Sequence, residues 1–180
     1  MRRIKFYLKT IYRLSLKSDK QQDILWKDLK KIIDLLNLNA GFYEKEKYAI
    51  VKFYVNDDKR AEFCYCISDG YYVCRVKILS DFSPELTTDI FVLASHFNNL
   101  MNLGTVSVNV EYQYVEYFIK SDMVVPLLFN GEIHSQMISH FETSKLIFAG
   151  FQRLVQENEA PAIIIADLMK ETNDEKNQNE

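Results

Sequence analysis

Glycine is scarce in this chain and is never clustered. Phosphate-binding loops need closely spaced glycines, because backbone N–H groups must approach the anion. Even the two nearest glycines, Gly131 and Gly150, are far apart, so the sequence contains neither a P-loop nor a dinucleotide-binding fingerprint. No serine has the flanking glycines of a nucleophile elbow. The motifs of the common nucleotide-binding and hydrolase folds are therefore absent.

Cysteine and histidine are also few. The three cysteines, Cys64, Cys66 and Cys74, are an odd number and cannot all pair within the chain. Side-chain alternation along two predicted strands puts Cys74 on a buried face and the other two on the opposite face, so they should not share a metal ion. The sequence predicts no metal site, no cofactor and no catalytic residue.

Long hydrophobic runs are missing as well. The longest, residues 124–129 and 160–166, are much shorter than the roughly 20 apolar residues that a membrane-spanning helix needs. Charges interrupt the N-terminal segment every few positions, unlike the apolar region of a signal peptide, so we expect a cytoplasmic protein. A net charge of −3 and a pI near 5.7 do not favour nucleic acid as a partner.

The sequence is long enough for one compact domain that buries roughly 70% of its unfolded surface. We assign this domain to residues 18–170. Residues 1–17 are expected to form a separate basic amphipathic helix, and residues 171–180 a disordered polar tail.

The N-terminal helix is strongly basic. The first 31 residues contain ten Lys or Arg and three Asp, whereas the rest of the chain is acidic. The favoured interpretation is that its apolar side packs on the domain or on a dimer mate, with the basic side in water. The alternative is that the helix lies on an anionic membrane surface or responds to anions. The apolar side, at 100° per residue, consists of Ile4, Tyr7, Leu8, Ile11 and Leu14.

Alternating apolar residues predict strands over 49–56, 61–68 and 71–78. Asp69-Gly70 is a typical two-residue hairpin turn, and it pairs the last two strands with their apolar sides matched. The outer face of this sheet should carry an apolar centre with charges around it. We predict that it binds another protein or an extended peptide segment, through Tyr54, Cys66, Tyr71 and Val73.

A helix should begin at Ser83-Pro84, with serine as the N-cap and proline at the first helical position. A second hairpin over residues 105–122 and a long helix from Gly131 follow. The sequence therefore predicts an α+β fold with an antiparallel sheet, in the order helix-β-β-β-helix-β-β-helix. Large apolar side chains also lie opposite the core stripe of the Ser83 helix. They predict a homodimer interface made by Phe91, Val92, Ser95 and Asn99.

The remaining polar candidates have weak signals. His140 falls within the apolar stripe of the long helix, where a hydrogen-bonded core histidine is more common than a catalytic one. His96 lies near Asp89 and Glu85, which is typical of a solvated charged flank. A general base in this cluster, and hence an unrecognised enzyme, is the alternative.

Four stretches resemble the YbjN domain family, whose fold is similar to that of type III secretion chaperones. They are Gly41-Phe42-Tyr43-Glu44, Ser83-Pro84, Phe97-Asn98-Asn99 before Gly104, and Val125-Pro126; the resemblance covers roughly residues 21–170. It implies a non-enzymatic protein of a family described as regulators of sensory transduction. The related chaperones are homodimers that bind extended segments of other proteins, and their second helix often supports dimerisation. By position this falls on Phe91, Val92, Ser95 and Asn99, and the resemblance implies no catalytic residue.

Overall fold

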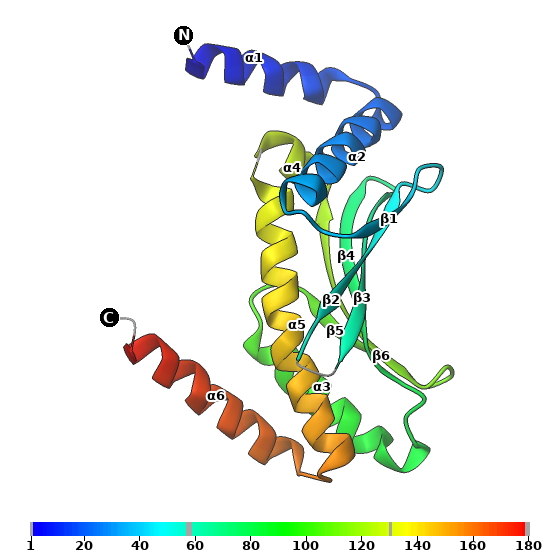
Figure 1. The fold of residues 1–180 in the computed structure, drawn as a ribbon, viewed down its shortest axis with the longest axis vertical. Helices are drawn as coiled ribbons and strands as arrows, with labels where there is room; N and C mark the ends of the chain where they lie inside the picture. The colour runs from blue at the N-terminus through cyan, green and yellow to red at the C-terminus, as the bar shows by residue number, and fades with distance from the viewer. Residues whose placement is uncertain (1, 57–58, 130, 179–180) are drawn as a thin grey trace. The chain divides into compact units, whose positions relative to one another are not determined.

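The computed structural model describes residues 2–56, 59–129 and 131–178, and the side chains of residues 7–56, 59–129 and 131–170. The described residues form an α+β fold with one six-stranded antiparallel sheet (Figure 1). In chain order the elements are α1 (Arg2–Ser15), α2 (Ser18–Leu35), β1 (Ala40–Tyr43), β2 (Tyr48–Tyr54), β3 (Arg60–Ser68), β4 (Tyr71–Ser80), η1 (Pro84–Leu86), α3 (Thr87–Leu100), β5 (Thr105–Asn109), β6 (Tyr114–Asp122), α4 (Val124–Leu128), α5 (Glu132–Gln156) and α6 (Pro161–Gln178).

The sheet has one strand more than the sequence predicts. Its order is β1-β2-β3-β4-β6-β5, so four strands rather than three precede α3. The additional strand, β1, is short and pairs with β2 from Ala40 opposite Val51 to Tyr43 opposite Tyr48. Tyr43 and Tyr48 stack with their ring centroids 4.2 Å apart. Such a cross-strand aromatic pair stabilises an edge strand that is too short to show an alternating pattern.

The predicted hairpin at Asp69-Gly70 is confirmed. Both residues have positive φ, 52° and 82°, as a two-residue turn of this kind requires. On the strands that flank the turn, one set of alternate side chains is buried: Phe63, Tyr65, Ile67, Tyr72, Cys74, Val76 and Ile78. The second predicted hairpin is confirmed too, because β5 and β6 pair with Val106 opposite Tyr117.

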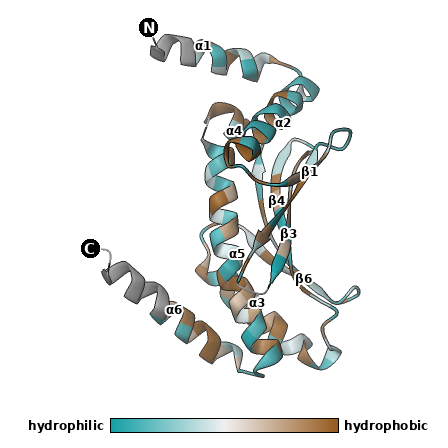
Figure 2. Cartoon of the chain, in the orientation of Figure 1, coloured by the Kyte–Doolittle hydropathy of each residue, from teal (hydrophilic) through white to brown (hydrophobic). Residues whose placement is uncertain are grey.

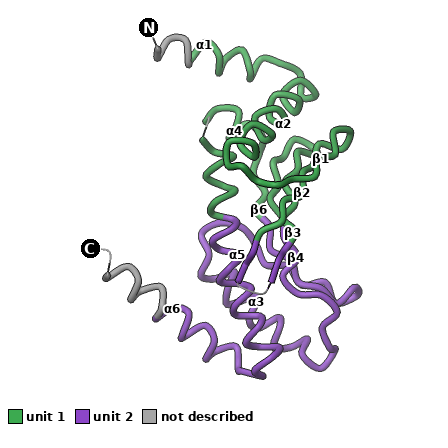
Figure 3. Tube along the Cα trace, in the orientation of Figure 1, with its two compact units in different colours: residues 1–53, 62–75, 119–139 green, residues 54–61, 76–118, 140–180 purple. Residues whose placement is uncertain are grey.

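The chain divides into two compact units (Figure 3). The first contains residues 1–53, 62–75 and 119–139, and the second contains residues 54–61, 76–118 and 140–180. In the first unit, α1 and α2 both contact α4. In the second, α3 contacts β5 and α6.

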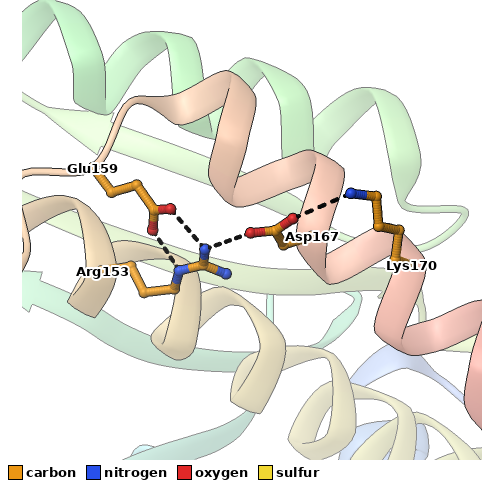
Figure 4. A network of polar contacts seen from close by, with 4 residues as sticks. All are labelled: Arg153, Glu159, Asp167 and Lys170. Carbon is orange, nitrogen blue, oxygen red and sulfur yellow. Dashed lines mark hydrogen bonds and ion pairs between the residues drawn. The ribbon is translucent and has the colours of Figure 1, made fainter.

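The end of α5 and the start of α6 are joined by an ionic network (Figure 4). The Arg153 guanidinium donates from Nε and from a terminal nitrogen to the two carboxylate oxygens of Glu159, at 2.6 and 2.9 Å, and also donates to Asp167 at 2.9 Å. Lys170 lies 3.6 Å from Asp167. The bidentate pair and the contact with Asp167 link the last turn of α5 to α6. The helix continues to Gln178, so it enters the segment predicted as a polar tail, whose side chains lie outside the described residues.

The structure corrects one half of the favoured interpretation of the N-terminal helix, namely that its apolar side packs on the domain. The other half, packing on a dimer mate, stays a prediction. Hydrophobic and hydrophilic residues alternate along the described part of α1 (Figure 2). Of the predicted apolar side, Leu14 is half-buried, the side chain of Ile4 lies outside the described residues, and the other three side chains are mostly exposed. Tyr7 and Ile11 are 63% exposed and Leu8 is 62% exposed, whereas Arg13 is only 7% exposed. The buried arginine has an ion-pair partner, Asp28, at 2.9 Å. This partner on α2 decides which side of α1 faces the protein.

A search of the described helices for an apolar segment long enough to cross a bilayer finds none.

Candidate interaction surfaces

The outer side of α3 is the first candidate surface, and its position follows from local sequence. Ser83 Oγ accepts a hydrogen bond from the Glu85 backbone N–H at 3.4 Å, and Pro84 occupies the first helical position. This confirms the predicted helix start, although the first turn is a 3₁₀ turn. The Asn98 side chain donates to the Val106 carbonyl at 3.0 Å and accepts from its N–H at 2.7 Å. Asn98 thereby fixes α3 against the start of β5.

The buried side of α3 consists of Ile90, Leu93, Ala94 and Phe97. The opposite side, which we call the α3 face, is exposed and is formed by Phe91, Val92, Ser95 and Asn99. Phe91 is 46% exposed and Val92 41%. None of the four side chains carries a charge, and the small Ser95 lies between the larger ones along the helix. The predicted dimer residues thus share one uncharged, partly apolar surface.

The four residues predicted to bind a partner segment divide between the two compact units. Cys66, Tyr71 and Val73 belong to the first, and Tyr54 belongs to the second. In the first unit Tyr71 is 37% exposed, Cys66 is half-buried and Val73 is buried. The Nζ atom of Lys120 lies 3.8 Å from the centroid of the Tyr71 ring.

Tyr54, in the second unit, has a similar environment. The residue is 55% exposed, and the Arg60 guanidinium carbon lies 4.3 Å from the ring centroid. Arg60 also donates a hydrogen bond to the Tyr54 hydroxyl. In both units an exposed tyrosine ring is therefore in contact with a cation, which gives each an amphipathic surface.

The cysteines lie as predicted, with Cys74 buried and Cys64 and Cys66 half-buried. A hydrogen bond from Cys64, assisted by the positive charge of Arg75, lowers the pKa of Cys66 to about 7. The same hydrogen bond and burial raise the pKa of Cys64, and burial raises the pKa of Cys74 to about 12. Among the described residues, no group of three or more His, Cys, Asp or Glu is arranged to hold a metal ion.

His140 is a core histidine, as predicted. It is fully buried, its ring stacks on Tyr117 with centroids 5.0 Å apart, and its Nε2 atom lies 3.3 Å from the Tyr117 carbonyl oxygen. Burial lowers the pKa of His140 to about 4, so the ring is neutral at pH 7. His96 is half-buried, whereas Asp89 and Glu85 are exposed.

Sequence reasoning did not predict a cavity of about 350 Å³ in the second unit. Lys59 lines it, with Nζ 4.6 Å from the centroid of the Phe148 ring, and burial lowers the pKa of this lysine. Asn56 donates a hydrogen bond to Gln152 at 3.2 Å beside it. A cation and an aromatic ring could accommodate a small anion with an apolar part. No sequence motif marks this cavity, because its walls come from separate segments: Asn56, Lys59, Ile78, Leu79, Phe148, Phe151, Gln152, Val155 and Gln156.

No protein-family model and no curated protein matches the chain.

Proposed function

We propose that this protein is a non-enzymatic protein-binding or regulatory module that acts as a homodimer. The observation that carries the proposal is the α3 face, an exposed, uncharged surface on a helix whose other side is buried. Within the described residues, the polar candidates are a core histidine, three cysteines that do not form a metal cluster, and an exposed charged flank. Binding explains this distribution of side chains better than catalysis does.

A second copy of the chain is the occupant that best suits the α3 face. In a two-fold symmetric interface the same surface meets itself, so a charge near the two-fold axis would face a like charge. The α3 face avoids this because it has no charged residue, and charged residues are depleted at the centres of interfaces.

The outer side of the strands is proposed to bind a segment of another protein. Exposed Tyr71 of the first unit and exposed Tyr54 of the second, each beside a cation, would each accept an apolar group together with an acidic one. The edge strands β1 and β5 offer a second mode, in which an extended segment adds a strand to the sheet.

We also propose that the chain is related to the YbjN domain family and that its fold has the arrangement of the secretion chaperones. The α+β class and the antiparallel sheet are compatible with both. They are also compatible with the mode of action of the related secretion chaperones, in which a homodimer binds extended segments.

The dimer is tested by Phe91→Asp, measured by light scattering. The wild type should have twice the chain mass of 21.2 kDa at high concentration. The variant should have the mass of one chain, because the substitution would bury one negatively charged carboxylate from each copy in the interface. Leu146→Asp is the matched control, because Leu146 on α5 is 44% exposed and Phe91 is 46% exposed. The Leu146→Asp variant should keep the mass of the wild type. If Phe91→Asp leaves the mass unchanged, or if the wild type is monomeric throughout, the dimer assignment is wrong.

A further inference from the structure

The helix α1 is attached to the first unit by its polar side. Arg13, at the centre of the basic side, is buried and paired with Asp28. Four large side chains of α1 are exposed, each by 62 or 63%: Tyr7, Leu8, Ile11 and Tyr12. An amphipathic helix of a globular protein normally has the opposite orientation, with its apolar side on the core.

Several contacts within the first unit hold this orientation. The Gln21 side chain on α2 is buried and donates to the backbone carbonyls of Arg13 at 3.3 Å and Leu14 at 3.0 Å. These carbonyls belong to the last turn of α1, where the helix has no internal donors left for them. α1 also contacts α4, and with these contacts made Leu8, Ile11 and Tyr12 are still 62 or 63% exposed.

The charge of α1 indicates what covers that side. The helix contains no Asp or Glu, and its basic residues are Arg2, Arg3, Lys5, Lys9 and Arg13. Pairing with α1 of a second copy would bring together two helices whose charges have the same sign, which is unfavourable. A lipid surface with anionic headgroups suits both properties, because it accepts apolar side chains below the headgroups and cations among them.

We propose that α1 docks this protein on an anionic membrane surface. The helix lies in the plane of the interface, with Leu8 and Ile11 entering the acyl region and the rings of Tyr7 and Tyr12 near the headgroups. Exposed Lys9 contacts the anionic headgroups, while the Arg13–Asp28 pair holds the unit to the opposite side of the helix. This role is separate from self-association through the α3 face.

Vesicle co-sedimentation of the full chain tests the proposal. Vesicles of phosphatidylcholine with phosphatidylglycerol should bind the protein at least tenfold more strongly than phosphatidylcholine alone, and added salt should weaken the binding. Leu8→Glu with Ile11→Glu should reduce the affinity at least tenfold, because it replaces the inserted apolar groups with charges. Lys9→Gln should reduce it by about fivefold, the contribution expected of one lysine at such a surface.

Leu35→Glu is the matched control. Leu35 is an 80% exposed leucine on α2 of the same unit, and its replacement should leave vesicle binding unchanged. All substituted side chains are exposed, so circular dichroism should show wild-type folding for each variant. Absence of wild-type binding to anionic vesicles at low salt would overturn the proposal, as would equal binding by the α1 double variant. A loss of dimer mass in the double variant, without vesicle binding by the wild type, would assign the helix to a protein contact instead.

Discussion

At the scale of single residues, the burial of His140 makes the stability of the fold depend on pH. Burial lowers its pKa to about 4 in the folded protein, against about 6.5 in the unfolded chain. Between these values the unfolded chain binds a proton that the folded protein excludes, so stability is fully present above pH 6.5 and falls as the pH is lowered towards 4. The ring stacking on Tyr117 accompanies this neutral form.

We therefore predict a specific acid sensitivity. The free energy of unfolding of the wild type should fall between pH 7 and pH 4.5 by about 2–3 kcal/mol more than that of His140→Gln, because the variant lacks the titrating group. Urea unfolding curves at the two pH values measure the difference. Carboxylates titrate in both proteins, so the variant also serves as the control. Parallel losses of stability in the two proteins would show that His140 is not held neutral by burial.

At the scale of elements, Gly150 sets the distance between α5 and α3. A Cβ atom added there would lie 2.8 Å from the Phe97 ring and 3.4 Å from Ile164 of α6. In an open helix, replacing glycine with alanine stabilises by roughly 0.5–1 kcal/mol. Here the side chain has no space, because Phe97 is only 6% exposed and stacks on Phe151 with centroids 6.1 Å apart.

Gly150→Ala should accordingly lower the free energy of unfolding by about 1–3 kcal/mol, as overpacking in a core does. Gly131→Ala provides the contrast, since an added Cβ at Gly131 meets no atom within 4 Å. That variant should differ from the wild type by no more than about 0.5 kcal/mol. Thermal or urea unfolding measures the free energies of unfolding of both variants and the wild type. A stabilised Gly150→Ala protein would contradict the close packing of α5 on α3.

Local chemistry explains which elements the sequence predicts well. Asp69-Gly70 and the Ser83-Pro84 start act through residues next to each other, so their structures could be read directly. The strand β1 depends on stacking of Tyr43 on Tyr48 and has no periodicity of its own. The orientation of α1 depends on Asp28 on another helix, and a helical wheel shows which residues share a side but not which side faces the protein.

The same distinction applies to the candidate surfaces. Periodicity along one helix was sufficient to predict that Phe91, Val92, Ser95 and Asn99 share an exposed side. The cavity beside Lys59 needed three segments to come together, and no spacing in the sequence indicates it. The environment of Tyr71 depends on Lys120, which is far from it in the sequence. The environment of Tyr54 depends on Arg60, which belongs to the next strand.

At the scale of the whole molecule, two exposed surfaces differ in charge and therefore in the partner they suit. The α3 face is uncharged and can meet itself, whereas α1 is cationic and is repelled by its own copy. The chain after residue 31 has an excess of acidic residues, which an anionic membrane repels. Membrane docking should therefore involve only the outward side of α1. The two proposed roles, self-association and membrane docking, should thus respond to separate substitutions.

The most direct test of the central claim, self-association through the α3 face, is a site-specific crosslink. Ser95→Cys, in a chain with Cys64 and Cys66 replaced by serine, should give a covalent dimer with a short bismaleimide, because Ser95 lies in the middle of the proposed interface. Ser139→Cys, at an exposed position on α5, should remain monomeric under the same conditions. Efficient crosslinking at Ser95 alone is the predicted result. If Ser95→Cys crosslinks no more than Ser139→Cys, the α3 face is not the dimer interface.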